Sequence, residues 1–391
     1  MRNFRFRLYP TKEQESKLRN SLGASRWLYN YFVSKGNLPI QDTQFMLTEL
    51  KEEEAWLRNY HSKMLQMVVH KIDSNRKVLN ALRMNGYKIG KMNFIGEEDY
   101  NSFTYSQSGF RIERHGNTDL LWLSKIGYIE IRLHRHPTNI KQITIVRRIN
   151  KWYALICCEI AKPIFRFINP KKSVGMDVGI TKFLHDSNNS TIDNPLFVKK
   201  MLKSLRRAQR RLSRRHKYSK NRLKAKTRLQ ILHERIRNKR LDFLHKVSTR
   251  YSKNYDVIFL ERLRVSSMVK NYHLARNIID SGWSTFKNIL AYKTKLVIEV
   301  PSNNTSVNCS KCGNKVPKSL AVRIHKCNVC NLMIDRDYNA SLNIKKKGLL
   351  LLLPQGLWEA TPVEILSESV KQEQNIVQRI VVHYRSIEET V

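Results

Sequence analysis

The chain has 391 residues, of which 41% are hydrophobic. This is enough for two to three domains of about 150 residues with real cores, which excludes a disordered basic tail. Its 72 Lys and Arg against 32 Asp and Glu give a formal net charge of +40. So large an excess predicts a polyanionic partner, and nucleic acid is the simplest one. An anionic membrane surface is the alternative, but no apolar run approaches the ~18 residues of a membrane span. With no secretory signal visible, we expect a cytoplasmic, nucleoid-associated prokaryotic protein without a membrane partner.

The N-terminal part begins with a strand and continues as helices. The first ten residues alternate basic and apolar side chains, so Arg5 and Arg7 share one face of a half-buried strand. Thr11 is placed to cap the following helix, with Gln14 at the capping-box position. From residue 13 to about residue 82, apolar residues recur every three or four positions, which predicts a small helical bundle.

The hydrophobic period changes to two between about residues 92 and 160. The clearest strands are residues 127–133, 142–147 and 152–159. We expect them to form an antiparallel barrel or sandwich that the N-terminal strand completes. Residues 161–172 contain two prolines and three lysines and are expected to form a linker.

Strands and helices alternate in the second half. Apolar strands are expected at 173–180, 255–261 and 296–300, and helices at 199–250, 274–291 and 335–344. The middle strand is continuously apolar, which indicates a buried central position in a sheet. The whole pattern therefore predicts an α+β protein of several domains.

The expected helix at 199–250 is almost uniformly basic. It holds 21 Lys or Arg and only two acids, Glu234 and Asp242. A charge run is usually a solvated face, but here ion pairs along the helix cannot balance the self-repulsion. A partner must supply the negative charge, and each neutralised phosphate adds salt-dependent affinity. The residues expected to contact nucleic acid are Arg5, Arg7, Arg206, Arg207, Arg210, Arg211, Arg214, Arg215 and Lys217.

Among these, Arg5 and Arg7 are weaker candidates than the residues of the basic stretch, and so are Lys12 and Arg26. Lys12 and Arg26 add positive charge close to the first strand. Tyr9, Trp27 and Tyr31 have flat rings on which bases could stack. Packing into a core is the favoured interpretation for these aromatic residues.

Four of the six cysteines form two CxxC pairs with 14 residues between them, Cys309 with Cys312 and Cys327 with Cys330. Two intervening residues let both thiolates of a pair face one ion, so two pairs build a closed tetrahedral zinc site. Because all four ligand positions are filled, the zinc is expected to be structural and to order a loop without a core of its own. Free cysteines or disulfides are the alternative, which an intracellular chain disfavours.

Three other residues could be mistaken for ligands. Cys157 and Cys158 lie in an apolar strand-like run and are expected to be buried small residues. His325 lies between the two cysteine pairs and is expected at the surface rather than on the metal.

Acids at the ends of apolar strands stand out against so much positive charge. Asp177 and Glu261 each lie at the end of such a strand, and the last helix opens with Asp335 and Asp337. Strand-end acids of a parallel sheet converge at its carboxyl edge. Three converging carboxylates repel one another unless cations bind them, and paired Mg²⁺ or Mn²⁺ ions suit such a site for phosphodiester hydrolysis. Asp335 and Asp337 compete for the third position. Asp335 could cap the last helix with Asp337 turned inward, but periodicity does not decide between them.

The glycines around Asp177 bear on its role. A single acid at a strand end is more often a capping or turn residue. Gly175 and Gly179 flank Asp177, and we interpret them as room for a ligand close to the backbone.

In these residues the chain resembles TnpB (OrfB), the protein family of bacterial insertion-sequence transposons that is related to type V CRISPR nucleases. The similarity runs from residue 1 to about residue 347, in the order of the family. The matching elements are Phe-Arg-Leu-Tyr-Pro at 6–10, Gly-Met-Asp-Val-Gly-Ile at 175–180, Leu-Ser-Arg-Arg at 212–215, Leu-His-Glu-Arg-Ile at 232–236, Asp-Phe-Leu-His-Lys at 242–246, Leu-Glu-Arg-Leu at 260–263, Gly-Trp-Ser-Thr-Phe at 282–286, and the cysteine pairs followed by Asp-Arg-Asp-Tyr-Asn-Ala at 335–340.

The resemblance implies a transposon-encoded, RNA-guided DNA endonuclease. The implied domains are a wedge-like β-barrel at 1–12 and 92–165, a helical recognition domain at 13–91, an RNase H-like (RuvC) nuclease domain at 173–305 and 331–348, an inserted zinc ribbon at 306–330, and a C-terminal tail at 349–391. The implied partners are a guide RNA from the same locus, double-stranded target DNA beside a short flanking motif, and a companion tyrosine transposase. Guide pairing would select the target, while the protein grips the heteroduplex by its backbone shape.

The resemblance also assigns the acids. Carried over to the matching positions, the triad that holds Mg²⁺ or Mn²⁺ is Asp177, Glu261 and Asp337. The family acid directly precedes the X-Asn-Ala segment, which gives the third position to Asp337 and leaves Asp335 outside the triad.

Some features depart from the family pattern. The family often has Glu-Asp-Leu where this chain has Glu-Arg-Leu at 261–263, and the segment between Lys293 and Val300 is shorter than usual. The shortening suggests an alternative function, a nuclease-impaired, RNA-guided DNA-binding protein that acts as a repressor. A transposase that joins strands itself is disfavoured, because no such module is visible.

The tail from Leu349 is acidic and expected to be poorly ordered, unless residues 349–353 pack on a core.

Overall fold

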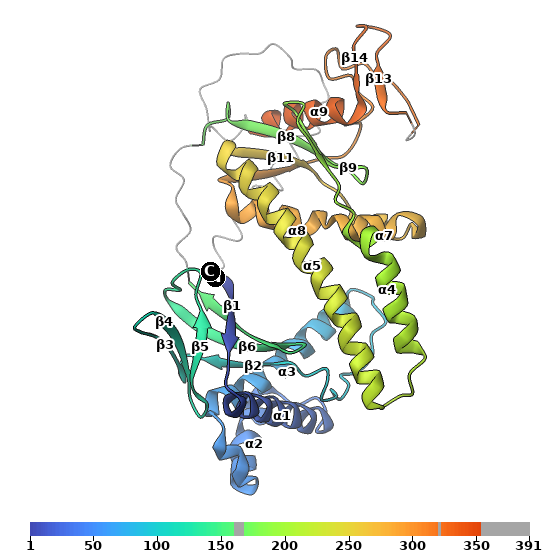
Figure 1. The fold of residues 1–391 in the computed structure, drawn as a ribbon. Helices are drawn as coiled ribbons and strands as arrows, with labels where there is room; N and C mark the ends of the chain where they lie inside the picture. Colours follow the sequence, from blue (N-terminus) through green and yellow to red (C-terminus); the bar gives the residue numbers. More distant parts are fainter. Residues whose placement is uncertain (160–167, 320–321, 353–391) are drawn as a thin grey trace. The chain divides into compact units, whose positions relative to one another are not determined.

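The computed structural model describes residues 1–159, 168–319 and 322–352, and the chain divides into two compact units, Met1–Pro163 and Ile164–Val391 (Figure 1). Residues 161–167 of the expected linker and residues 353–391 of the expected tail lie outside the described residues.

The first unit combines helices with one antiparallel sheet. Its elements are β1 (Arg2–Tyr9), α1 (Lys12–Ser34), α2 (Ile40–Glu53), the 3₁₀ helix η1 (Ala55–Asn59), α3 (Ser62–Met84), β2 (Ser102–Ser106), β3 (Phe110–His115), β4 (Thr118–Leu123), β5 (Gly127–Arg132), β6 (Ile140–Arg148) and β7 (Lys151–Cys158). The seven strands pair in the order β2-β6-β7-β1-β5-β4-β3. Among the described residues no ladder joins β2 to β3, so the predicted closed barrel is not confirmed.

Helices and sheet of the first unit share one hydrophobic core. The alternation in β1 places Phe6 and Leu8 in this core and leaves Arg5 exposed. Cys157 and Cys158 are buried in β7, as predicted. The capping box of α1 is also present, because the side chains and backbone N–H groups of Thr11 and Gln14 bond to each other.

Stacking of aromatic rings completes this core. Trp27 stacks on Tyr31 at a centroid distance of 5.5 Å, and Trp56 meets Trp27 edge-on at 5.1 Å. Trp27 and Tyr31 also pack against the hydrophobic core. Their rings therefore serve packing, which is the interpretation that the sequence favours for them, whereas Tyr9 is 43% exposed.

The second unit is built around a five-stranded sheet. Its elements are β8 (Ser173–Val178), β9 (Lys182–Asp186), β10 (Thr191–Asp193), α4 (Phe197–Ser213), α5 (Lys220–Asn254), β11 (Val257–Glu261), α6 (Val265–Met268), α7 (Tyr272–Ser281), α8 (Trp283–Lys293), β12 (Leu296–Val300), β13 (Ile324–Lys326), β14 (Met333–Asp335) and α9 (Arg336–Leu352). The strand order is β10-β9-β8-β11-β12. The strands β8, β11 and β12 are parallel, while β9 is antiparallel to β8 and β10 to β9.

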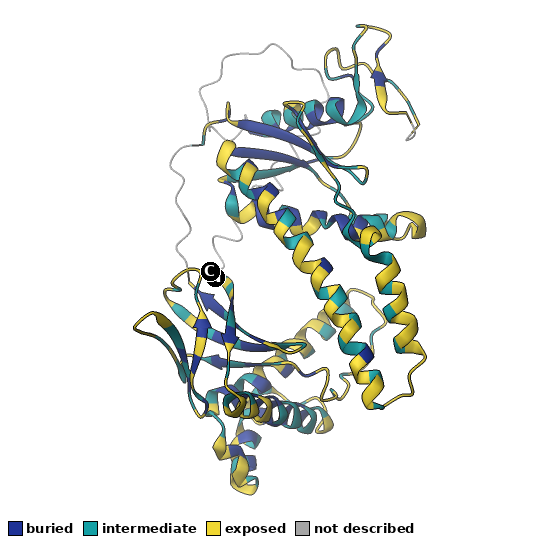
Figure 2. Ribbon diagram, in the orientation of Figure 1, coloured by how far each residue is buried: buried dark blue, intermediate teal, exposed yellow. Residues whose placement is uncertain are grey.

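Helices cover both faces of this sheet (Figures 1 and 2). In β11, Ile258 and Leu260 belong to a core that includes residues of α5, α7 and α8. Val257 and Phe259 of the same strand point to the opposite face and pack with Ile344 of α9. Because both faces are buried, the strand is continuously apolar, as the sequence indicated.

The helix α9 lies in close contact with the sheet, and glycines make this possible. A Cβ at Gly175 would lie 2.3 Å from the carbonyl oxygen of Ser341, and one at Gly348 would lie 2.0 Å from the ring of Phe259. At Gly179 an added Cβ would lie 2.9 Å from the carbonyl oxygen of Lys182, in the β8–β9 turn. The interpretation of these glycines as room for a ligand was therefore wrong, because the chain itself makes the close approach.

Three expected helices have different bounds in the structure. The basic stretch is not one helix but the hairpin of α4 and α5, which is interrupted where Tyr218 has a φ of 66° and Ser219 caps α5. The expected helix at 274–291 is divided at Gly282, whose φ is 69°. The last helix is longer than predicted and extends to Leu352, because its apolar end packs against the β11 and β12 face of the sheet.

The shortened segment before Val300 still forms a complete strand. The helix α8 ends at Lys293, and β12 begins at Leu296. This strand pairs with β11 along its whole length, from Val257↔Leu296 to Glu261↔Val300. The shortening therefore leaves the strand next to Glu261 intact.

Candidate active site and zinc ribbon

Two of the predicted acids lie on neighbouring parallel strands. Asp177 lies near the end of β8 and Glu261 ends β11. The register pairs Leu260 with Met176, so the two acids follow directly at the same carboxyl edge of the sheet. Asp337 joins them from the first turn of α9, the helix that packs on β8. The fold therefore brings the three acids to one edge.

The electrostatics of Asp177 reflect this convergence. Burial raises the pKa of its carboxyl well above the ordinary value, and the negative charges of Glu261 and Asp337 raise it further. Burial also raises the pKa of Glu261, while a hydrogen bond from Thr305 and the charge of Lys347 oppose this shift. Both acids are therefore poor at holding a negative charge unless a cation compensates it.

Asp335 and Asp337 have different environments. Oδ1 of Asp335 accepts the backbone N–H of Asp337 at 2.8 Å and that of Tyr338 at 3.2 Å, which makes Asp335 the cap of α9. Nδ1 of the buried His185 lies 3.4 Å from the same oxygen. Asp335 thus serves the start of the helix, and the Asp337 side chain is left for other partners.

Two arginines are those partners. Oδ2 of Asp337 lies 3.6 Å from Nη1 of Arg323, and its Oδ1 lies 3.4 Å from Nε of Arg336. Within the described part of the chain, the four cysteines are the one group of metal-ligand side chains whose ligand atoms all lie within 4.8 Å of one another. The three carboxylates at the sheet edge therefore lie near each other, but their oxygen atoms are not all close enough to bind one ion.

Other buried acids of this unit have complete sets of hydrogen-bond donors. Asp186 accepts the hydroxyl of Tyr251 at 2.7 Å and the backbone N–H groups of Asn188 and Ser190 at 2.9 Å each. Asp280 accepts Arg240 at 2.7 Å and the N–H of Val198 at 2.8 Å. These acids stabilise turns and helix packing, which distinguishes them from the acids at the edge.

The four cysteines form a site that suits zinc. Sγ of Cys309 lies 3.5 Å from Sγ of Cys330, and Sγ of Cys312 lies 3.5 Å from Sγ of Cys327. Tetrahedral Zn–S bonds of about 2.3 Å require sulfurs roughly 3.8 Å apart, so the spacing fits. None of the four is in a disulfide. Backbone N–H groups of Cys330 and Val329 lower the pKa of the Cys327 thiol, whereas burial and hydrogen bonds with the neighbouring thiols raise the pKa of Cys330. The crowded thiols thus share protons, and a bound cation would favour the thiolate form of all four.

His325 is not at the surface, so this prediction was wrong. It is the middle residue of β13, and it is fully buried inside the ribbon. Its Nδ1 contacts Nζ of Lys318, and burial followed by that positive charge lowers the pKa of the imidazole. The alternation of the short hairpin turns this side chain inward, a pattern too short to recognise in the sequence.

A polar stripe on α9 was not predicted from the sequence. Asn339, Asn343 and Lys347 are spaced by four residues and lie along one side of the helix. All three bond to the segment between β12 and the first cysteine, in which Thr305 contacts Glu261. The regular spacing was the available signal, although the partners of the stripe lie more than 25 residues away in the chain.

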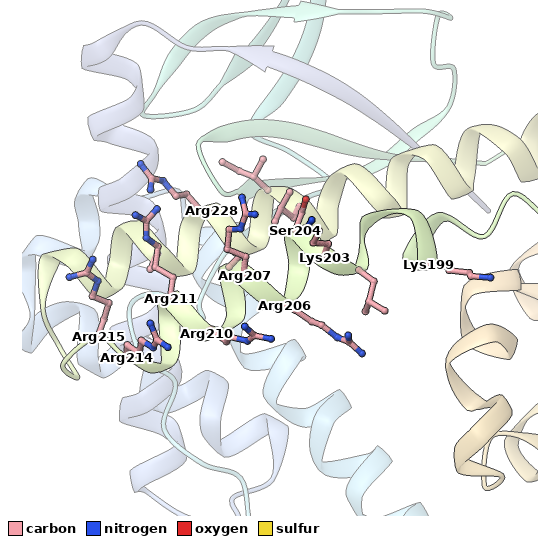
Figure 3. Close-up of a pocket in the computed structure, with 15 residues that line it drawn as sticks. Lys199, Lys203, Ser204, Arg206, Arg207, Arg210, Arg211, Arg214, Arg215 and Arg228 are labelled. Atoms are coloured by element: carbon pink, nitrogen blue, oxygen red, sulfur yellow. The ribbon is translucent and has the colours of Figure 1, made fainter.

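The basic residues of α4 and α5 lie around a hollow between the two helices (Figure 3). Its volume is about 1510 Å³, and α4 has no buried residue (Figure 2). Within the described residues, no ion pair involves any of the seven predicted contact residues of this hairpin. Six of them line the hollow together with Arg228 of α5, namely Arg206, Arg207, Arg210, Arg211, Arg214 and Arg215, while Lys217 lies in the connecting turn.

The two arginines of β1 differ from each other. Arg5 is exposed, with its guanidinium 5.2 Å from the ring centre of Tyr153. Arg7 lies 5.3 Å from the ring of Tyr9 and donates to the carbonyl oxygen of Trp152 at 3.0 Å. Arg7 therefore already has a structural role in the sheet.

Among the described helices, none is both long and apolar enough to cross a bilayer.

Comparison with known proteins agrees with the predicted family. A family model described as "Probable transposase" matches residues 156–272, and one described as "Cas12f1-like, TNB domain" matches residues 283–344. A protein of Escherichia coli (strain K12) named "Putative RNA-guided DNA endonuclease InsQ" is 30% identical over 382 residues, covering 89% of this chain and 92% of that protein. The chain belongs to the TnpB (OrfB) family.

Further comparisons extend over most of the chain. A protein of Streptomyces pristinaespiralis named "Putative RNA-guided DNA endonuclease" is 31% identical, covering 89% of each chain. Among solved structures, the Cas12f1 chain of a Cas12f1–sgRNA–target DNA complex has a similar fold, with a TM-score of 0.56, 18% identity, and 85% of this chain and 83% of that chain covered. The mixed α+β architecture therefore resembles that of Cas12f1.

The family match at the N-terminus differs from the structure of this segment. A model described as "Helix-turn-helix domain" matches residues 1–37. In the structure these residues form the strand β1 and the single helix α1, followed by a turn. The described residues of this segment thus contain no pair of helices.

Proposed function

We propose that this protein is an RNA-guided, divalent-metal-dependent DNA endonuclease whose catalytic triad is Asp177, Glu261 and Asp337. The observation that carries the proposal is the convergence of these acids at the carboxyl edge of β8 and β11. The names of its relatives in Escherichia coli and Streptomyces pristinaespiralis support the same activity. We further propose that the second unit is an RNase H-like, RuvC-type domain with the zinc ribbon inserted at 306–330.

The residues at this edge fit a magnesium or manganese site by their chemistry. Carboxylate oxygens are the ligands that such hard cations prefer. The pKa of Asp177 is raised first by burial and then by the nearby charges of Glu261 and Asp337, so a bound cation would favour its charged form. Bound in pairs, these ions activate water and stabilise the leaving oxygen of a phosphodiester. Asp177 and Glu261 would hold the cations from the sheet, and Asp337 from the helix once its arginine contacts are exchanged.

The basic hairpin and the first strand would provide the contacts to nucleic acid. The arginines of α4 present an unpaired cationic surface to a phosphate backbone, in agreement with binding by shape. Arg5 is the more available of the two arginines in β1. The proposed partners are a guide RNA from the same locus and double-stranded target DNA beside a short flanking motif, with a companion tyrosine transposase from the same element. Such a protein would act in the cytoplasm of a prokaryote, at the nucleoid.

One observation favours a second function. Arg323 and Arg336 neutralise Asp337, and the acids are not gathered around one ion position. If this arrangement persists with nucleic acid bound, the protein binds its guided target without cutting and acts as a repressor. Strand transfer by the protein alone has no support in the described residues.

The test is cleavage by protein purified with its own RNA. We expect co-purifying RNA from the locus, and cutting of a duplex that matches it when Mg²⁺ or Mn²⁺ is present. Binding of the duplex without cutting in either metal would support the repressor, and strand transfer would support a transposase. Intact cleavage by an Asp177→Ala variant would refute the assigned triad.

A further inference from the structure

Thr305 is the direct neighbour of one proposed catalytic acid. Its hydroxyl lies 2.6 Å from Oε1 of Glu261 and 3.1 Å from the carbonyl oxygen of Ser302, and its single proton favours the shorter, charge-assisted bond. Thr305 is only 3% exposed, so water does not replace this donor. The side chain of Glu261 therefore depends on Thr305 for its orientation.

The backbone of Thr305 is fixed in turn by the polar stripe of α9. Nδ2 of Asn343 donates to the carbonyl oxygen of Thr305 at 2.8 Å and to that of Asn308 at 2.7 Å. Both protons of this amide are thus used on one segment of backbone. Lys347, one turn further along the helix, donates to the carbonyl oxygen of Asn303 at 2.5 Å. The segment that holds Thr305 is therefore anchored on both sides of the threonine.

The same stripe reaches the zinc ribbon. Nδ2 of Asn339 donates to the carbonyl oxygen of Asn308 at 2.8 Å, and its Oδ1 accepts the N–H of Ser310 at 2.9 Å. Asn308 and Ser310 enclose Cys309, the first cysteine of the ribbon. Asn339 is fully buried, so these bonds lie in a dry environment, where they are costly to leave unmade. The position of the first knuckle is thereby fixed to the helix that carries Asp337.

We propose that Thr305 is a positioning residue for Glu261, and that it makes the metal affinity of the active site depend on the folded zinc ribbon. The connection runs from Cys309 through Asn339 and Asn343 to Thr305 and ends at the carboxylate of Glu261. Among the described residues, no hydrogen bond joins a cysteine of the ribbon to a proposed catalytic acid, so the coupling passes through this hydrogen-bonded segment. The inference rests on the proposed function, because it assumes that Glu261 binds the catalytic metal.

The measurement is Mn²⁺ binding by the full-length, zinc-loaded protein without nucleic acid, followed by electron paramagnetic resonance of the free ion. Thr305→Val keeps the shape of the side chain and removes the hydroxyl. Because hydrogen-bonded partners of metal ligands typically contribute 10- to 100-fold in affinity, we expect binding about 10-fold weaker or more. Thr305→Ser restores the hydroxyl and should return the affinity to near that of the wild type.

Thr294→Val is the matched control. Thr294 is equally buried, at 4% exposure, lies in the same unit, and its hydroxyl has no hydrogen-bond partner among the described residues. Its substitution should leave Mn²⁺ binding unchanged. Equal Mn²⁺ binding by Thr305→Val and wild type would overturn the proposal, and so would a failure of Thr305→Ser to restore it.

The connection to the ribbon is tested by removing zinc with a chelator and repeating the titration. We expect zinc removal to weaken Mn²⁺ binding in the wild type and to add little in Thr305→Val, because the two changes break one connection. Fully additive effects would overturn the coupling. If the wild type binds Mn²⁺ but never cuts DNA, the proposed function fails, while the Mn²⁺ titrations still decide the role of Thr305.

Discussion

The carboxylate of Asp335 accepts the backbone N–H of Asp337 at 2.8 Å, so one acid caps the helix that presents the other. The sequence left these two residues as competitors for one role. Their separate contacts indicate two different roles. Asp335 fixes the start of α9, and Asp337 is available to a metal once Arg323 and Arg336 release it.

This division predicts opposite outcomes for two similar substitutions. Asp335→Asn keeps a capping side chain and should leave cleavage within a few-fold of wild type, because Asn caps about as well as Asp. Asp337→Asn removes the proposed metal ligand and should lower the cleavage rate at least ~100-fold, which corresponds to ~2.7 kcal/mol. Single-turnover cleavage of a guide-matched duplex measures both. The reverse ranking would assign the third position to Asp335.

The raised pKa of Asp177 predicts a pH-dependent cost to stability in the metal-free protein. The folded state holds this proton more tightly than the unfolded chain does, whose carboxyl has a pKa of about 3.9. Stability is therefore lost as the pH rises from that value through the folded pKa. We expect metal-free Asp177→Asn to have a higher Tm than wild type at pH 7.5, with the difference vanishing near pH 4.

Asp193→Asn serves as the control for this experiment. Asp193 lies in β10 of the same sheet and is exposed, so its substitution should not change the Tm with this pH dependence. Adding Mn²⁺ should raise the Tm of wild type and not that of Asp177→Asn. A Tm for Asp177→Asn that is lower than that of wild type at every pH would argue against an uncompensated charge at this position.

Loss of one cysteine should dissociate the zinc and unfold the ribbon locally. Cys312→Ser removes an exposed ligand, so we expect the bound zinc to disappear and the segment 306–330 to become sensitive to protease. Cys157→Ser makes the same chemical change in the first unit and should retain the zinc. Zinc content by atomic absorption and limited proteolysis report the result. Undiminished zinc in Cys312→Ser would contradict the four-cysteine site.

The basic hairpin should bind nucleic acid through phosphate contacts. Changing Arg210, Arg211, Arg214 and Arg215 to Gln should weaken binding of all sequences alike and reduce the slope of log K against log salt by roughly 0.7–0.9 per lost contact. The same four positions changed to Lys keep the charge and should keep most of the slope. Fluorescence anisotropy over a range of salt concentrations measures this, and an unchanged slope in the Gln variant would remove the hairpin from the interface.

The sequence predicts the meeting of the strand-end acids well, because parallel strands with acids at their ends have one way to bring those acids together. Asp177 and Glu261 become neighbours through strand register alone, and the cysteine pairs need only their spacing. The role of Gly175 could not be foreseen in this way, because the same residue type suits a ligand and a crossing helix. The α9 stripe was also missed, since the contact between Thr305 and Glu261 depends on the path of a loop.

Local helix breaks were harder to place than whole elements. Gly282 divides α7 from α8. A Cβ added at this position would lie 3.2 Å from Cδ of Arg240, so packing against α5 also favours glycine at the helix break. The division of α4 from α5 near Ser219 likewise depends on one capping side chain within a long basic run. Periodicity identifies the helical segments, whereas their ends depend on single residues and packing.

Asp177, Glu261 and Asp337 are proposed to cut DNA that an RNA guide selects. The most direct test programs the purified wild-type protein and its Asp177→Asn variant with the same co-purifying RNA and supplies a matching duplex with Mg²⁺. We predict that both bind the duplex with similar affinity and that the wild type alone cuts it. Equal cutting by the two proteins, or binding without any cutting by the wild type, would contradict the claim.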